Sequence, residues 1–136
     1  MTVIFPNQHQ NYCSFSDNVY KRVLEGENQL TVITAELNQP KNEEQVIEDL
    51  FILNEMLDVG LDKNKVTEIY PVLSKYNDTK SPNIQTFLAG IYRKTKIPDG
   101  FGPLVRMLIQ DSINPPEDTK FDPTEEIGGA ILDYLA

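Results

Sequence analysis

Residues 42–60 read NEEQVIEDLFILNEMLDVG and decide how the middle of the chain folds. Asn42 is a favourable helix cap, and Gln45 three residues later completes a start that is similar to a capping box. The apolar residues then recur at helical spacings of three and four: Val46, Leu50, Leu53 and Leu57. Gly60 is a typical residue just past a helix end. The stretch therefore predicts an amphipathic helix over residues 43–59.

Capping residues also open the next two predicted helices. Asp62 precedes an apolar stripe that Pro71 interrupts, so a kink or break is expected before that proline. Ser81 and Pro82 form a cap followed by proline at the first helical position, and this helix is expected to reach about Thr95. The core positions expected in these two segments are Val66, Ile69, Leu73, Tyr76, Ile84, Phe87, Leu88 and Ile91.

Two more helices are expected in the C-terminal part of the chain. After a turn at residues 98–100, Pro103 starts a helix that must end before Pro115 and Pro116. Residues 122–125 (Asp-Pro-Thr-Glu) combine a cap, a helix-starting proline and a capping-box acid for the last helix. Their expected core positions are Leu104, Val105, Leu108, Ile109, Ile127, Ala130, Ile131, Tyr134 and Leu135.

Two glycines interrupt the last predicted helix. Gly128 and Gly129 each cost about 1 kcal/mol relative to alanine in a helix interior. That cost indicates a close approach of another helix at this point.

The first forty residues carry weaker signals. Ser16 or Asp17 is suited to cap a short helix. The stretch from Leu30 to Leu37 fits either a strand, from its β-branched residues, or a helix, from its apolar spacing. Because no other segment offers a partner strand, we favour the helix.

These patterns predict an all-α fold, a compact multi-helix domain of six or seven helices over residues 1–136, with residues 1–42 as its least defined segment. An alternative arrangement within the same class is helix-pair, solenoid-like stacking, although no known repeat signature is present.

Composition excludes several classes of function. With 12 basic and 21 acidic residues, the net charge is −9 and the sequence pI is about 4.5, which disfavours binding to nucleic acid or to an anionic membrane. No apolar run approaches the ~20 residues of a membrane span, and the first residues lack the pattern of a signal peptide. We therefore expect a cytoplasmic protein.

No catalytic or metal-binding constellation is found. Cys13 is the single cysteine and His9 the single histidine, which are too few for a disulfide or a zinc site. Glycine-rich phosphate loops are absent, and Asp62 fits a helix cap better than a calcium loop. The sequence thus predicts no enzyme activity, no cofactor and no metal. An enzyme that uses Cys13 and His9 is the least favoured alternative, because no third residue orients the pair.

The charge is strongly segregated along the chain. Residues 43–62 hold seven acids and no base, and residues 63–106 hold eight bases and three acids. Residues 107–136 hold seven acids and one base. We call residues 63–106 the basic centre, and residues 43–62 and 107–136 the two acidic blocks. The basic centre either neutralises the acidic blocks within the fold or leaves them for solvent or a partner.

On a helical wheel, the helix over residues 43–59 has a second, acidic face, and the helix contains no lysine or arginine. Glu44, Glu48 and Glu55 share one sector, with Phe51 and Asp58 at its edge, and we call these five residues the acidic face. Glu44 and Glu48 are a like-charged pair one turn apart, which costs a few tenths of a kcal/mol. A face kept acidic at this cost fits a cationic partner, and it also fits the basic segment lying against it or a solvated surface.

The functional prediction is a small acidic binding protein that neutralises a basic protein partner, such as a toxin-immunity protein or nuclease inhibitor. The alternative is a structural or adaptor helical module, self-associating and without an inhibitory role. The partner-binding residues predicted are those of the acidic face (Glu44, Glu48, Phe51, Glu55 and Asp58), followed by Glu117, Asp118 and Asp122.

Overall fold

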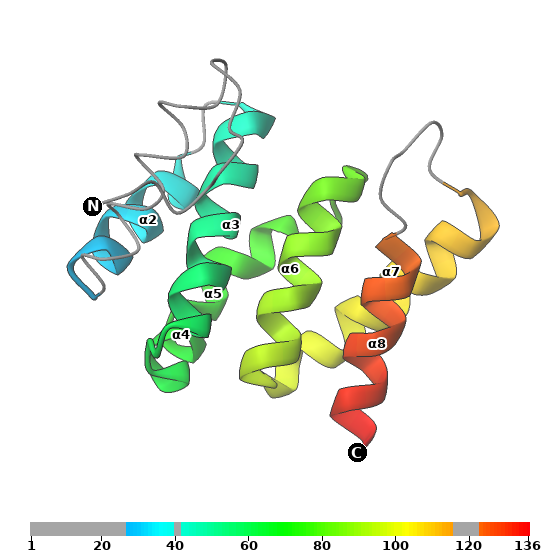
Figure 1. The fold of residues 1–136 in the computed structure, drawn as a ribbon. Coiled ribbons are helices and arrows are strands. Elements are labelled where there is room, and N and C mark those ends of the chain that lie inside the picture. Colours follow the sequence, from blue (N-terminus) through cyan, green and yellow to red (C-terminus); the bar gives the residue numbers. More distant parts are fainter. Residues whose placement is uncertain (1–26, 40–41, 116–122) are drawn as a thin grey trace, which may run out of the picture.

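The computed structural model describes residues 27–39, 42–115 and 123–136, and all regular structure within them is helical (Figure 1). The α-helices are α2 (Glu27–Asn38), α3 (Glu43–Asp58), α4 (Lys63–Glu68), α5 (Tyr70–Leu73), α6 (Pro82–Thr95), α7 (Phe101–Ile113) and α8 (Pro123–Leu135). Two 3₁₀ turns, η1 (Ser74–Tyr76) and η2 (Pro98–Gly100), follow α5 and precede α7. The all-α prediction is confirmed, and so is the helical interpretation of Leu30 to Leu37, which lies within α2.

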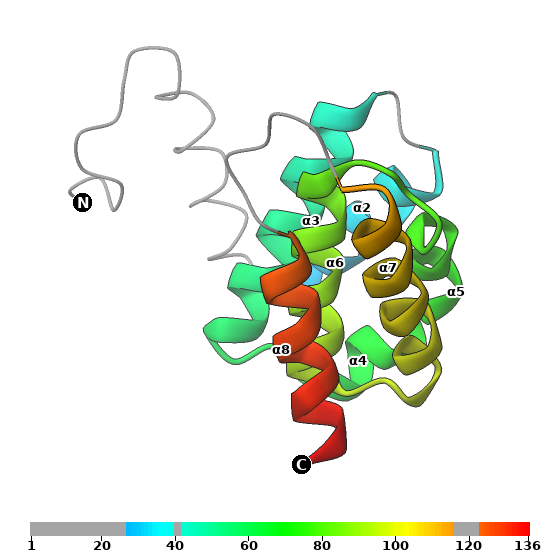
Figure 2. The same ribbon diagram turned by 90° about the vertical axis from the view of Figure 1, so that its right-hand side faces the viewer.

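The helices form two layers (Figure 2). In one layer α6 packs against α3 on one side and against α8 on the other. The three run in the same direction, because later residues of one helix meet later residues of the next. Phe51 contacts Phe87 and Asp58 contacts Lys94, while Tyr134 reaches the segment after α6. α2, α5 and α7 make up the second layer, so the described residues form a compact, two-layered all-α domain.

Capping interactions set the helix ends as the sequence predicts. Asn42 Oδ1 accepts a hydrogen bond from the Gln45 amide at 2.8 Å, and Asp62 Oδ1 accepts one from the Asn64 amide at 2.9 Å. Gly60 has a φ of +115°, and the amide of Leu61 after it donates to the carbonyl of Met56 at 2.9 Å. This is a Schellman end, in which glycine takes a backbone conformation that other residues adopt with strain.

Prolines set the other boundaries. α4 ends at Glu68 and α5 begins at Tyr70, so the break expected before Pro71 is confirmed. α7 begins at Phe101, two residues earlier than expected, because η2 leads directly into it. Pro103 still lies in the first turn, where its missing N–H costs no hydrogen bond. The caps predicted at Ser16 or Asp17 and at Asp122 lie outside the described residues.

The core is wider than the predicted stripe on α3. Val46, Leu50 and Leu53 are buried and Leu57 is partly buried. Ile52 and Met56, which lie off that stripe, are also buried, because α3 contacts α2 as well as α6.

Two predicted core positions are wrong. Ile109 on α7 is 55% exposed and Leu135 on α8 is 70% exposed. Both lie on the sides of their helices that no described element covers.

The close approach expected at the glycine pair is confirmed at one of the two positions. A Cβ on Gly129 would lie 3.0 Å from Nη1 of Arg93, whereas a Cβ on Gly128 would meet nothing within 4 Å. The neighbour that needs the space is therefore a guanidinium on α6, and Gly128 has no packing role in the described structure.

Tyrosine hydroxyls hold the corner between α6 and α7. Tyr92 donates to Oδ1 of Asn77 at 2.6 Å, and the Asn77 amide donates to the hydroxyl of Tyr70 at 3.2 Å. Tyr134 donates to the carbonyl of Ile97 at 2.5 Å. Burial raises the pKa of Tyr92 well above its usual value and that of Tyr134 to about 12. These hydroxyls therefore keep their protons, and so remain donors, throughout the neutral pH range.

A buried carboxyl lies between α6 and α7. Asp111 is 6% exposed, and its Oδ1 accepts a long hydrogen bond of 3.4 Å from Nε2 of Gln85. Asp111 Oδ2 and Gln85 Oε1 are both buried and find no hydrogen-bond partner among the described residues. Burial raises the pKa of Asp111, and the bond from Gln85 offsets part of that shift.

We expect Asp111→Asn to be more stable than the native chain at pH 7 by about 1 kcal/mol, because an amide carries no charge and can donate to Gln85 Oε1. The stabilisation from a carboxyl whose pKa is raised by folding is fully present below its unfolded pKa and is lost as pH rises through the folded value. The advantage of the variant should therefore shrink as pH falls through the raised folded pKa of Asp111 and be smallest below about 4. Urea unfolding from pH 3 to 8 measures it, and a less stable variant at pH 7 contradicts the assignment.

Candidate functional site

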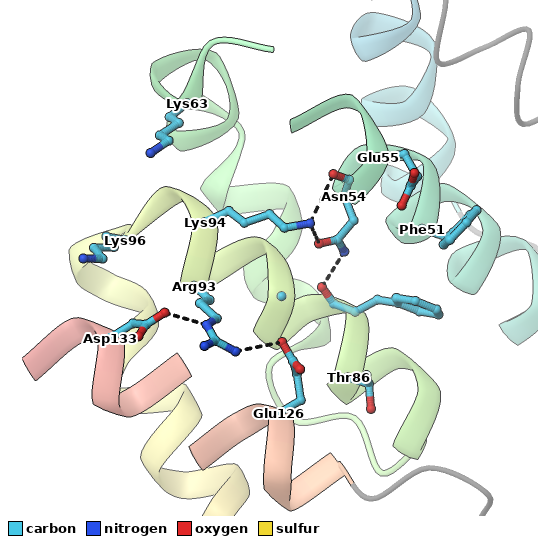
Figure 3. Close-up of a pocket in the computed structure, with 12 residues that line it drawn as sticks. Phe51, Asn54, Glu55, Lys63, Thr86, Arg93, Lys94, Lys96, Glu126 and Asp133 are labelled. Carbon is cyan, nitrogen blue, oxygen red and sulfur yellow. Dashed lines mark hydrogen bonds and ion pairs between the residues drawn. The ribbon is translucent and has the colours of Figure 1, made fainter. Parts of the chain in front are cut away.

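A groove of about 590 Å³ lies along the layer formed by α3, α6 and α8, and none of its lining residues comes from α2 or α7 (Figure 3). We call this feature the groove. Its lining residues are Phe51, Asn54, Glu55, Lys63, Thr86, Phe87, Gly90, Arg93, Lys94, Lys96, Glu126 and Asp133. Apolar rings lie at one end and cations at the other.

The apolar end is an aromatic pair. The rings of Phe51 on α3 and Phe87 on α6 meet edge to face, with centroids 5.7 Å apart and an angle of 66°. Both side chains are only partly buried against the core. Thr86 lies beside them, and its hydroxyl donates to the carbonyl of Pro82 within α6. This end therefore carries partly exposed aromatic surface.

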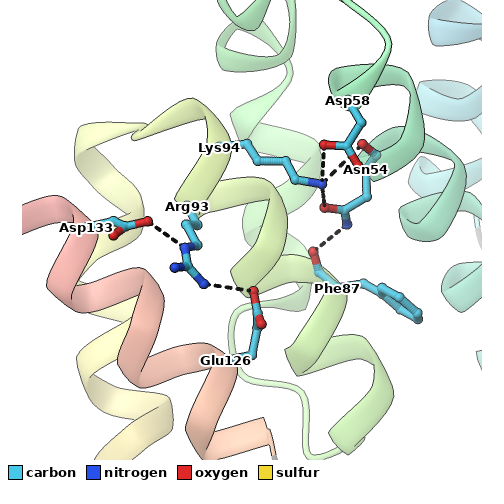
Figure 4. Close-up of polar contacts among 7 residues, drawn as sticks. All are labelled: Asn54, Asp58, Phe87, Arg93, Lys94, Glu126 and Asp133. Atoms are coloured by element: carbon cyan, nitrogen blue, oxygen red, sulfur yellow. Dashed lines mark hydrogen bonds and ion pairs between the residues drawn. The ribbon is translucent and has the colours of Figure 1, made fainter.

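Asn54 forms the floor of the groove and is 6% exposed. Its Nδ2 donates to the carbonyl of Phe87 at 2.8 Å and to that of Leu50 at 3.2 Å. Its Oδ1 accepts a hydrogen bond from Nζ of Lys94 at 3.0 Å (Figure 4). A Cβ on Gly90 would lie 2.8 Å from the same oxygen, so glycine is needed for α6 to approach α3 this closely.

Two adjacent cations on α6 point to different helices (Figure 4). Nε of Arg93 contacts Asp133 at 2.5 Å and its Nη1 contacts Glu126 at 3.6 Å, both on α8. The hydrogen bond to Asp133 is the main reason that the pKa of Arg93 is raised above its usual value. Nζ of Lys94 pairs with Asp58 at the end of α3 at 3.0 Å. The basic centre is thus shared between the two acidic blocks.

Three other charged side chains line the groove. Lys63 and Lys96 are exposed at its cationic end, and Glu55 is half-buried beside Phe51. Within residues 27–39, 42–115 and 123–136, no hydrogen bond or ion pair engages these three side chains. Lys96 ends α6 with a φ of 54°, the left-handed conformation common after a helix.

The acidic face is only partly gathered at the groove. Phe51 and Glu55 line it, and Asp58 lies at its edge through the pair with Lys94. Glu44 is exposed and Glu48 is half-buried. Both lie on the same side of α3 as Phe51, about two turns and one turn before it. The second predicted group, Glu117, Asp118 and Asp122, lies outside the described residues, as do His9 and Cys13.

Sequence reasoning did not place Asn54, Phe87, Lys63 and Lys96 in one site. Asn54 carries no signal of its own in the sequence, because the charged Glu55 follows it between the apolar Leu53 and Met56. Phe87 was assigned to the core, and the structure places it at the core's edge.

The described part of the chain shows no cluster of three or more histidine, cysteine or acidic side chains that could hold a metal ion. In the same residues, no helix has the length and apolar character of a membrane span. The groove contains acids, bases and aromatic rings.

No family model matches this chain, and no curated protein or solved structure is significantly similar to it.

Proposed function

We propose that this protein is a small acidic binding protein that docks and neutralises a basic protein partner on the acidic face of α3. The observation that carries the proposal is how the charges are paired. Lys94 neutralises Asp58, whereas the neighbouring Arg93 is occupied by Glu126 and Asp133 of α8. Two acids of α3, Glu44 and Glu55, are therefore not matched by the basic centre within the described residues.

Glu44 and Glu55 support this reading. Neither makes a hydrogen bond or ion pair within the described ranges, and Glu44 is exposed. Glu55 lies next to the partly exposed ring of Phe51, and an aromatic ring among charged neighbours is a typical anchor at protein interfaces.

The net charge of −9 would act before contact is made. A cationic partner is attracted over a distance of about 8 Å, the screening length at physiological salt, and this attraction raises the association rate. Occlusion of a cationic active site by the acidic face would then inhibit the partner, as in a toxin-immunity protein or a nuclease inhibitor.

The test is charge reversal on the acidic face. Glu44→Lys, Glu48→Lys and Glu55→Lys together should weaken binding of basic proteins captured by the native chain by about tenfold or more and flatten the salt dependence. The matched control reverses three exposed acids elsewhere, Glu68, Asp78 and Asp99, with the same change in net charge. Equal affinity and equal salt slope for the two triple variants would refute the proposal.

A structural or adaptor module that self-associates is the second candidate, and exposed apolar residues favour it. Leu132 and Leu135 on α8 are 67% and 70% exposed, and Ile113 on α7 is 70% exposed. Light-scattering mass of the native chain and of Leu132→Gln discriminates between the candidates. A dimer that the substitution dissociates supports this module, and a monomer excludes self-association.

A further inference from the structure

The charged and aromatic residues along α3 are spaced so that a second helix packed beside α3 can contact each of them. Glu44, Glu48, Phe51 and Glu55 follow one another at intervals of four, three and four residues. They form a stripe about 16 Å long on one side of α3. A second helix laid beside this stripe presents its own side chains at the same intervals. The stripe therefore complements an amphipathic helix with cationic residues around one apolar residue.

The aromatic pair provides the surface against which that apolar residue packs. Phe51 and Phe87 approach from two different helices, are only partly buried, and both line the groove. A leucine or aromatic side chain placed against them buries apolar surface on both α3 and α6 at once.

The charged side chains are distributed unevenly along the groove. Because α3 and α6 run in parallel, Lys63 after α3 and Lys96 after α6 lie at the same end of the layer. The acids of the stripe begin at Glu44, near the opposite end of α3. Arg93 and Lys94 are compensated by their ion pairs, so the two exposed lysines define the cationic end.

We propose that the groove seats one amphipathic helix of the partner, with an apolar anchor against Phe51 and Phe87, cations along the α3 stripe, and an acidic end at Lys63 and Lys96. This inference rests on the proposed function and adds to it the shape, anchor and polarity of the bound segment. It predicts that a purely cationic helix binds less well than one that is cationic with an acidic end.

The experiment uses two synthetic helical peptides and the full chain. Both carry lysines at the spacing of the α3 stripe and one tryptophan at the anchor position, and only one has two glutamates at an end. The chain contains no tryptophan, so indole emission reports burial of the peptide alone. We expect a blue shift on binding and at least severalfold tighter binding of the peptide with the acidic end.

Two substitutions test the anchor and the polarity separately. Phe87→Ala should weaken binding by about tenfold or more and reduce the blue shift, with Phe87→Leu close to native. Phe101→Ala is the matched control, a partly buried ring that contacts Tyr134 away from the groove. Lys63→Glu with Lys96→Glu should invert the preference between the peptides, whereas the same change at the exposed Lys80 and Arg106 should not.

The outcomes separate this inference from the proposed function. Unchanged peptide binding by folded Phe87→Ala, or an unchanged preference in the lysine variant, overturns the helix-seating inference. So does a native chain that binds neither peptide. The acidic face remains supported if its triple reversal still abolishes capture of basic proteins, because that result does not depend on the aromatic pair or the lysines.

Discussion

Replacing Gly100 with alanine is expected to lower the free energy of unfolding by about 2–3 kcal/mol. The added Cβ would lie 2.8 Å from the hydroxyl oxygen of Tyr134 and 2.9 Å from Cγ of Tyr92. Tyr92 is completely buried, and the Tyr134 hydroxyl is bonded to the carbonyl of Ile97, so neither ring can move without losing packing or a hydrogen bond. The strain is steric, because the φ of Gly100 is −81°.

Gly102 provides the control, since it lies two residues further along the same segment. A Cβ there would meet only Nη1 of Arg106, at 3.5 Å, which is an ordinary contact. Gly102→Ala should leave stability unchanged or raise it by up to about 1 kcal/mol through helix propensity. Urea unfolding of both variants measures the difference, and equal stability would contradict the packing described at this corner.

Asn54→Ala is expected to cost about 2–3 kcal/mol. The substitution removes both hydrogen bonds that the Asn54 amide donates to the carbonyls of Leu50 and Phe87. It also removes the oxygen that holds Nζ of Lys94 at the groove. The Phe87 carbonyl then loses the side-chain donor that links α3 to α6, and the loss of this hydrogen bond accounts for most of the cost.

A double-mutant cycle with Lys94→Ala shows whether the amide acts through that lysine. Lys94 is partly exposed and also pairs with Asp58, so its own substitution should cost about 1 kcal/mol or less. The two single effects should sum to more than the double effect, because both remove the same contact. A cost below about 0.5 kcal/mol for Asn54→Ala would mean that its hydrogen bonds are not needed for stability.

Helix positions were largely predictable because their causes are local. The caps at Asn42, Asp62 and Ser81 each bind an amide two or three residues away, as the sequence spacing required. The break before Pro71 and the Schellman end at Gly60 likewise depend on a few neighbouring residues. The start of α7 was misplaced because a 3₁₀ turn and an α-helix can join without a cap.

The candidate site was predictable only in part. Helical periodicity correctly placed Phe51 and Glu55 on one side of α3, at the groove. It gave no information about Phe87 or Lys96, which join them from another helix. The misassignment of Ile109 and Leu135 has the same origin, since an apolar stripe does not say whether a neighbour covers all of it.

The sequence by itself determined the helices, their ends and the segregation of charge, because these follow from residues within a few positions of one another. Only the tertiary structure decided how the charges pair. Arg93 and Lys94 are adjacent in the chain, yet one reaches Glu126 and Asp133 and the other reaches Asp58. Successive side chains on a helix point about 100° apart, so neighbouring cations meet different helices once these are packed on either side. That packing also leaves Glu44 and Glu55 at the surface of α3 without a described partner.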